Sequence, residues 1–442
     1  MVLAVLIAAV PASAKRGHEP RVNPMIFVHG GAGSGAQFES QKMRFTSNGY
    51  PRRYVRTVDY DSLFTVNTRE DVYAKIDALV ADLQRRTGKL KVDILGHSLG
   101  TTIMHEYLGS PARAANVGHY VNIDGRTAAT PPGGVSTLAI WAGRGTPGRV
   151  IGGAINTTVP NQTHVQVATS RESFREMFRF FTGREPATID IVPEHRRVRI
   201  AGRAVLFPSN VGVADAMVEA WPLDAVTGRR TGARPRVILP VRSDGGWGPV
   251  WLRPGRRYEL VLVRAGARDH RFFYEPFVRS DDLVRLLTSA PGEALDLLVE
   301  RSDRHASVVV TRNKELWGDQ GTQSDVLSVN GTNLLNAATA PMTKRLIGLF
   351  AFDVGSDGVS NVGSPLAALA ALPFISGVDH FMPADPNGRG TVSVALTSRG
   401  AGPARTITFP NLPSSQVQAS IQFNDFEQVC RRCLPWPSRQ PR

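Results

Sequence analysis

Cysteine is almost absent from this sequence of 442 residues, which has only Cys430 and Cys433, close to its C-terminal end. A fold stabilised by a set of disulfides is therefore excluded. A Cys-x-x-Cys pair can be a redox motif, but such a motif precedes a helix in a βαβ unit, and here Pro435 and Pro437 follow. We expect a local disulfide that holds the C-terminal tail, residues 428–442, and no catalytic role for either cysteine.

Metal and nucleotide motifs are absent as well. No group of cysteine, histidine and carboxylate residues has the spacing of a metal site. The chain also has no G-x-x-x-x-G-K-S/T loop and no G-x-G-x-x-G turn directly after a strand, the two patterns that bind nucleotide phosphates. We therefore expect a protein that needs neither a bound metal nor an organic cofactor.

Lysine is scarce too, since only seven of the 52 basic residues are lysines and the net charge of +14 comes almost wholly from arginine. The basic residues are scattered rather than gathered into runs, which argues against nucleic acid as a partner. The charge is compatible with attraction to an anionic surface or interface, and equally with a genome-wide preference for arginine codons.

Long apolar runs are missing, so we expect no helix that is integral to a membrane. The N-terminal run Val2–Val10 has nine residues, and Ala12 and Ala14 after it fit the A-x-A pattern of a cleavage site. We expect residues 1–14 to be a signal peptide and the protein to be secreted. A signal peptide usually has a basic residue before its apolar run, and here none precedes Val2. Two alternatives would explain this: Met1 is an internal start, or the run is a strand rather than a signal peptide.

The most informative motif is a serine in a strand–turn–helix context. A short β-branched run ends at Leu95, a helical pattern begins at Thr101, and Gly96-His97-Ser98-Leu99-Gly100 stands between them. G-x-S-x-G in this context predicts a nucleophile elbow, which lifts the Oγ of Ser98 out of the sheet. The glycines leave room for the sharp turn. The alternative is a glycine-rich turn in which the serine has no role.

A second glycine-rich turn lies upstream. An apolar strand over Asn23–His29 is followed directly by two glycines, so that the sequence there is HGG. Hydrolases with a G-x-S-x-G elbow place half of their oxyanion hole after such a strand. We expect the backbone N–H of Gly31, or that of Ala32, to work together with the N–H of Leu99.

Strands and helices alternate along the first 181 residues. Asn67-Thr-Arg-Glu70 predicts a capping box that begins a helix, which Gly88 ends. This alternation predicts a mostly parallel sheet with helices on both faces, the α/β class. The other predicted elements of this part are strands at 54–58, 117–123 and 136–141 and a helix at 170–181.

A serine nucleophile needs a histidine base and an acid that orients it, in the chain order serine, acid, histidine. Between Ser98 and His164 the only acids are Glu106 and Asp124, and Glu106 lies two helical turns beyond the serine. Asp124 follows a strand, at the sheet edge where ligand-facing residues collect, so we predict the triad Ser98, Asp124 and His164. Three other histidines lie between Leu95 and Asp124, namely His97, His105 and His119. None of them follows the acid, so none fits this chain order.

Residues 23–181 resemble an α/β-hydrolase of the lipase and esterase kind, through HGG after a strand, GHSLG at the elbow, an aspartate after a strand and a late histidine. In most of that superfamily the acid follows the second strand after the nucleophile, where this sequence has Arg144. The earlier acid, Asp124, is similar to the arrangement in two-domain archaeal-type long-chain lipases. That resemblance implies a β-rich C-terminal domain.

The pattern changes at about Thr188, where period-two runs separated by glycine, proline and aspartate replace the helical periodicity. We expect a catalytic domain at 15–186, a β-sandwich module at 187–268 and a second β-rich module at 269–427. Residues 187–268 resemble the small seven-stranded sandwich appended to carboxypeptidases and many secreted enzymes. The apolar segment Leu369–Met382 is expected either in the core or along an acyl-chain channel. Strands are predicted at 198–207, 215–222, 236–242, 257–264, 306–311, 326–329, 345–353, 391–397, 404–409 and 417–423.

Together these patterns predict a secreted serine ester hydrolase, a lipase or carboxylesterase that forms an acyl-enzyme on Ser98. Its expected partner is an acyl ester or lipid substrate at an interface. The same triad would also suit a polyester, amide or peptide hydrolase, and the motif does not separate these. A binding protein that keeps a hydrolase scaffold without catalysis is an alternative from another class. The sequence indicates no oligomeric state.

Overall fold

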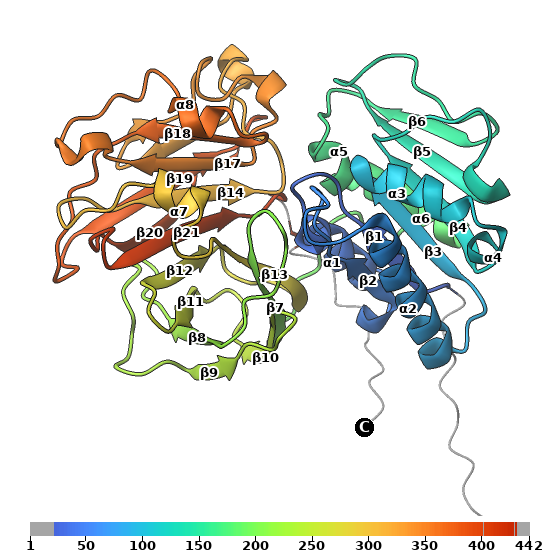
Figure 1. The fold of residues 1–442 in the computed structure, drawn as a ribbon, viewed down its shortest axis with the longest axis horizontal. Coiled ribbons are helices and arrows are strands. Elements are labelled where there is room, and N and C mark those ends of the chain that lie inside the picture. The colour runs from blue at the N-terminus through green and yellow to red at the C-terminus, as the bar shows by residue number, and fades with distance from the viewer. Residues whose placement is uncertain (1–21, 401, 428, 431–442) are drawn as a thin grey trace, which may run out of the picture.

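The computed structural model describes residues 22–400, 402–427 and 429–430. An α/β unit in the N-terminal part lies beside a larger β-rich unit (Figure 1). The expected order, an α/β-hydrolase followed by β-rich sheets, is therefore confirmed. The predicted signal peptide, residues 1–14, and Cys433 lie outside the described residues, so the signal peptide and the local disulfide stay predictions.

The α/β unit has one six-stranded sheet in the order β2-β1-β3-β4-β5-β6, and every neighbouring pair is parallel. The central strands are buried on both faces, which explains their continuous apolar sequence. The elements are β1 (Met25–Val28), α1 (Glu39–Ser47), β2 (Val55–Val58), α2 (Arg69–Thr87), β3 (Val92–His97), α3 (Leu99–Leu108), α4 (Pro111–Ala114), β4 (Val117–Ile123), β5 (Ser136–Ala142), β6 (Ile155–Val159), α5 (Gln166–Thr169) and α6 (Arg171–Thr182).

Helices cover both faces of this sheet. The aromatic side chains of α1 and α6 form one core with the sheet, and the apolar stripes of α2 and α3 form the other. The capping box of α2 stands one residue later than the sequence pattern suggested, because Thr68 and Asp71 cap each other's backbone. The Oδ1 of Asn67 instead accepts a hydrogen bond from the backbone N–H of Asp61.

The sixth strand, β6, was not anticipated. Its sequence, Ile155-Asn-Thr-Thr-Val159, has little apolar alternation, and three of its five side chains are exposed. An edge strand with one partner needs little burial, so hydrophobic periodicity does not signal it. Its position matters because the loop after it carries His164.

The β-rich unit has an eight-stranded sheet in the order β18-β17-β14-β21-β12-β11-β8-β9, a three-stranded sheet β10-β7-β13 and a four-stranded sheet β16-β15-β19-β20. The elements are β7 (Val198–Leu206), β8 (Ala216–Pro222), β9 (Val237–Pro240), β10 (Gly246–Leu252), β11 (Tyr258–Arg264), β12 (Asp269–Tyr274), β13 (Asp281–Thr288), α7 (Ala294–Leu298), β14 (Val308–Arg312), β15 (Val326–Val329), β16 (Thr332–Asn333), β17 (Gly348–Phe352), α8 (Ala367–Ala370), β18 (Ile375–Asp379), β19 (Thr391–Thr397), β20 (Arg405–Pro410) and β21 (Val417–Phe423).

The two small sheets pack on opposite faces of the large one, as the alternation along β12 shows. Phe272 and Tyr274 join the core beneath the three-stranded sheet, whereas Phe273 joins the core beneath the four-stranded sheet. The boundary expected at 268/269 falls inside the first of these cores, because β12 and β13 belong to it and β13 pairs with β7. The change of module therefore comes after β13 rather than before β12.

Candidate active site

Ser98 stands between β3 and α3 in a strained turn. Its φ is 53° and its ψ is −121°, outside the regions that a serine normally adopts. The turn is tight because a Cβ at Gly96 would lie 2.6 Å from the carbonyl oxygen of Gly100, and a Cβ at Gly100 would lie 2.3 Å from that of Val28. Both flanking glycines are thus required by close backbone approach, as the elbow pattern predicted.

The structure brings the three predicted residues into one hydrogen-bonded chain. The Nε2 of His164 lies 2.8 Å from the Oγ of Ser98, and its Nδ1 lies 2.6 Å from the Oδ2 of Asp124. Ser98 follows β3, Asp124 follows β4 and His164 stands in the loop after β6. Because these strands are parallel, the three loops meet at the carboxyl edge of one sheet.

Asp124 is held as an acceptor by more than the histidine. Its Oδ1 accepts from the backbone N–H of Ala142 at 3.1 Å and from Nη1 of Arg149 at 2.9 Å. Burial raises the pKa of Asp124, but the hydrogen bonds from His164 and Ala142 and the charge of Arg149 outweigh it and leave the pKa lowered. The guanidinium of Arg149 also lies 4.5 Å from the ring centroid of Trp141.

Arg149 is a site residue that sequence reasoning missed. It belongs to no motif, and only the fold brings it beside the acid. Arg144, which occupies the usual position of the superfamily's acid, is exposed. Of Arg144 and Arg149, only Arg149 hydrogen-bonds to Asp124.

His97, next to the serine, makes a different contribution. Its Nε2 donates to the carbonyl oxygen of His164 at 2.8 Å, and its Nδ1 accepts from the side-chain amide of Gln37 at 2.9 Å. Burial, with the neighbouring His164, lowers the pKa of His97 to about 3, so this imidazole is neutral at ordinary pH. It is placed to hold the His164 backbone rather than to exchange protons.

The other candidates lie away from Ser98. His105 hydrogen-bonds to Asn122 at 3.2 Å, and His119 pairs with Asp93 at 2.8 Å. Glu106 forms an ion pair with Arg69 on the helix face that packs toward α2. None of these side chains contacts the Ser98–His164–Asp124 chain within the described residues.

One of the two expected oxyanion donors on the upstream turn is already used. The N–H of Ala32 donates to the Oγ of Ser62 at 2.8 Å. In the described part of the chain the N–H groups of Gly31 and Leu99 have no acceptor, and both stand beside Ser98. The geometry therefore favours Gly31 over Ala32 as the partner of Leu99.

The β-rich unit reaches into this site. Glu315, which is fully buried, accepts from the backbone N–H of Val165 at 2.6 Å and from that of Gln166 at 2.9 Å, directly after His164. Asn313 donates to the carbonyl oxygen of Ala36 at 3.0 Å, beside the oxyanion turn. Glu315, about 150 positions further along the chain, thus holds the histidine loop, and Asn313 holds the backbone at Ala36; no local pattern in the sequence indicated either contact.

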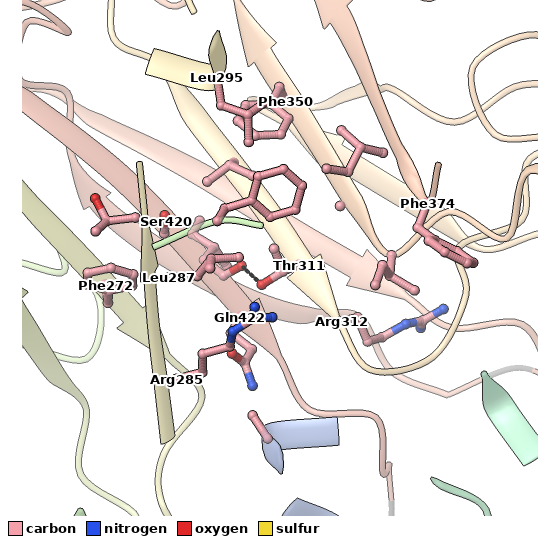
Figure 2. Close-up of a pocket in the computed structure, with 18 of the residues that line it drawn as sticks. Phe272, Arg285, Leu287, Leu295, Thr311, Arg312, Phe350, Phe374, Ser420 and Gln422 are labelled. Carbon is pink, nitrogen blue, oxygen red and sulfur yellow. Dashed lines mark hydrogen bonds between the residues drawn. The ribbon is translucent and has the colours of Figure 1, made fainter. Parts of the chain in front are cut away.

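A small cavity at Ser98 adjoins a larger one. The smaller is lined by Ser98 and His164, and the larger, of about 120 Å³, is mainly apolar and is lined by neither of them. Figure 2 shows the larger cavity, with Leu295 and Phe350 close together at its upper end in this view, Phe374 apart from them, and Arg285 and Gln422 close together below. Five residues line both cavities: Ala32, Arg285, Asn313, Ile347 and Phe374.

The apolar segment Leu369–Met382 divides between the two roles expected for it. Phe374 and Ile375 line the larger cavity. Leu369, Val378 and Met382 are buried in the cores of the β-rich unit instead. The segment therefore supplies one wall of a cavity while most of its bulk stabilises the fold.

Comparison with known families agrees with this architecture. The model of lipase (class 2) matches residues 22–117, that of the lipase C-terminal domain matches 196–291, and a model described as a "-like, C-terminal domain" matches 294–427. No curated protein matches the chain.

Solved structures give weaker likenesses. A Bacillus licheniformis lipase in its propeptide form is 10% identical over 89% of this chain and 94% of that chain, with a TM-score of 0.31. Phospholipase PlaB from Legionella pneumophila in complex with thio-NAD is 8% identical over 94% and 98%, with a TM-score of 0.23. A pyrethroid hydrolase is 18% identical over 25% of this chain and only 42% of its own length, with a TM-score of 0.21.

The family matches, together with the fold, define a lipase-like protein in which an α/β-hydrolase unit precedes a β-rich C-terminal region. They support an ester-hydrolysing enzyme. No helix within the described ranges is long and apolar enough to cross a membrane. The same ranges contain no group of three or more His, Cys, Asp or Glu side chains placed to hold a metal ion.

Proposed function

We propose that this protein is a serine hydrolase of carboxylic esters, a lipase or carboxylesterase that accepts an apolar acyl chain. The observation that carries the proposal is the hydrogen-bonded chain Ser98–His164–Asp124, whose serine and histidine line a small cavity that adjoins the larger apolar one. A serine with a hydrogen-bonded histidine and a carboxylate behind it is the arrangement that activates a hydroxyl as a nucleophile.

In the proposed reaction the Oγ of Ser98 attacks the ester carbonyl while the Nε2 of His164 takes its proton. The imidazolium then protonates the leaving alcohol, and Asp124 stabilises that positive charge throughout. Water, activated by the same histidine, hydrolyses the acyl-enzyme. The negative charge on the carbonyl oxygen is stabilised by the N–H groups of Gly31 and Leu99, each worth about 3–4 kcal/mol in a preorganised site.

The acyl chain is assigned to the larger cavity. Apolar side chains from β12, β13, β14, β17 and the α7 region line it, so a hydrocarbon chain there is removed from water. Each buried CH₂ contributes about 0.8 kcal/mol. We therefore propose that the β-rich region supplies chain-length preference as well as structure.

Replacement of the nucleophile tests the proposal. Ser98→Ala is expected to lower the hydrolysis of nitrophenyl esters by about 10⁴-fold or more, with an unchanged melting temperature. Ser110→Ala is a matched control, because that side chain begins α4 without a capping hydrogen bond. A serine-directed phosphonate should label the wild type and the control but not Ser98→Ala. Full activity in a folded Ser98→Ala variant would contradict the proposal.

Secretion is part of the same proposal. Residues 1–14 are expected to be removed during export, because a short apolar run and small residues at 12 and 14 fit a signal peptide. N-terminal sequencing of protein recovered from the culture medium would find a chain that begins near residue 15. Retention of Met1 in the mature protein would contradict this part of the proposal.

A further inference from the structure

A larger cleft lies between the two units. Ser98, Asp124 and His164 do not line it, although Arg285 lines it as well as both cavities described above. Its volume is about 860 Å³, and α1, α2 and β2 of the α/β unit line it together with β7, β10 and β13 of the β-rich unit. We call it the basic cleft. Its charged residues are Lys42, Arg52, Arg53, Arg56, Lys75, Arg199, Arg203, Arg242 and Arg285, with Asp59, Asp244 and Asp282.

The composition of the basic cleft departs from that of the chain. Nine basic side chains face three carboxylates there, whereas the whole sequence has 52 basic and 38 acidic residues. A preference for arginine codons would raise the number of arginines everywhere, but it does not explain why carboxylates are depleted in one cleft. The depletion favours a local requirement for positive potential.

The three carboxylates leave several of these cations without an ion pair. Within the described residues, no carboxylate lies within 4.0 Å of the charged nitrogens of Arg53, Arg56, Lys75 or Arg199, since none of them has a salt bridge. Arg56 and Arg199 are half-buried, on opposite walls of the cleft. Each carboxylate already has its own partner: Asp282 pairs with Lys42 at 2.5 Å, Asp59 with Arg203 at 2.5 Å and Asp244 with Arg242 at 3.7 Å.

The cations also oppose one another. Burial lowers the pKa of Arg199, and the charge of Arg52 lowers it further. Burial lowers the pKa of Lys42 despite its pairing with Asp282, and Arg56 adds to that effect. Positive charges that repel each other in a half-buried cleft are relieved when an anion binds between them.

We propose that the basic cleft is a binding site for a ligand that carries two or more phosphate groups. Guanidinium groups match phosphate oxygens in pairs, and several of them on two facing walls suit a ligand with more than one phosphate rather than a single small anion. The phosphates belong either to a soluble polyphosphate compound or to the headgroups of an anionic phospholipid. The site is separate from ester hydrolysis, which the triad performs.

The test uses the full chain and two charge-matched double variants. Arg56→Ala with Arg199→Ala removes two charges from the basic cleft. Arg85→Ala with Arg86→Ala removes two from the exposed end of α2, where both arginines pair with Asp82. Titration calorimetry with tripolyphosphate measures soluble binding, and co-sedimentation with phosphatidylglycerol or phosphatidylcholine vesicles measures binding to headgroups. Hydrolysis of nitrophenyl butyrate is recorded separately and is expected to stay unchanged in both double variants.

The wild type should bind at least one phosphate probe, with an affinity that falls as salt rises. The cleft variant should bind it about tenfold more weakly or worse, and the control within about twofold of the wild type. Tripolyphosphate binding alone assigns a soluble ligand, and binding to phosphatidylglycerol vesicles alone assigns a headgroup. Equal weakening in both variants, no binding of either probe, or stronger cleft-dependent binding of an oligonucleotide would overturn the proposal.

Discussion

Removal of the Glu315 carboxylate is expected to impair catalysis from outside the triad. The carboxylate is fully buried and accepts from two successive N–H groups, those of Val165 and Gln166. A hydrogen bond to a charged group contributes about 1.5–3 kcal/mol, so Glu315→Ala removes about 3–6 kcal/mol of local stabilisation. The loss falls on the segment that follows His164 and leaves two backbone donors without an acceptor.

This loss should appear in turnover rather than in substrate binding. The imidazole of His164 must stay within hydrogen-bond distance of Ser98, and a misplacement of about 1 Å costs about 100-fold. We expect kcat for a short nitrophenyl ester to fall about 100-fold in Glu315→Ala, with little change in KM. Glu315→Gln keeps the shape and one acceptor oxygen, so its kcat should fall only about tenfold.

A matched control separates positioning from general stability. Glu259 is also buried, on β11, where it pairs with Arg230 and Arg271 far along the chain from the histidine loop. Glu259→Gln should lower the melting temperature while kcat stays within about twofold of the wild type. If Glu315→Ala lowers the melting temperature as Glu259→Gln does and leaves kcat unchanged, the carboxylate only stabilises the fold and the reasoning is refuted.

Three further predictions concern the acid, the acyl cavity and an interior carboxyl group. Asp124→Asn should lower kcat by about 10³–10⁴-fold in a stopped ester assay, because the imidazolium loses its charged partner; near-normal turnover would exclude Asp124 as the acid. Val309→Phe should fill the apolar cavity and lower kcat/KM for dodecanoyl esters by about 100-fold, since about four excluded CH₂ groups cost about 3 kcal/mol. Hydrolysis of butyryl esters should be unaffected, and so should both activities in the control Val326→Phe, whose side chain is exposed. Equal losses at both chain lengths would contradict the cavity's role. Burial raises the pKa of Asp281 to about 7, above that of an unfolded aspartate, so its ionisation opposes folding increasingly between about pH 4 and 7. The difference in melting temperature, Asp281→Asn minus wild type, should therefore increase between pH 5 and pH 8. A difference that stays constant or decreases would contradict the burial effect.

Much of the α/β unit was predictable because its signals are local. The strand, turn and helix around Ser98 occupy a few consecutive residues. Chain order left His164 as the base and two acids, of which Asp124 follows a strand and Glu106 lies two helical turns beyond the serine. The capping box of α2 begins one residue later than predicted, because the side chain of Asn67 accepts a hydrogen bond from the backbone N–H of Asp61 and Thr68 caps the helix. Hydrophobic periodicity does not show which of two neighbouring polar side chains will cap a helix.

Other site residues could not be predicted, for a physical reason. Arg149, Asn313 and Glu315 reach the site through hydrogen bonds to residues that lie 25 or more positions away in the chain. Nothing in their neighbours' sequence specifies the partner, which is fixed only when the sheets pack. The module boundary near residue 268 failed similarly, because β13 pairs with β7 more than 80 positions earlier.

The contacts of the β-rich unit also change what its removal would show. A chain that ends near Pro186 would keep Ser98, Asp124 and His164 and would lack the residues of the β-rich unit that line the apolar cavity. Such a chain would also lose Glu315 and Asn313, which brace the histidine loop and the backbone beside the oxyanion turn. It would therefore lose activity toward short and long esters alike, whatever the cavity binds. Single substitutions that fill the cavity, or that remove one brace at a time, separate the two roles because each leaves the interface between the units in place.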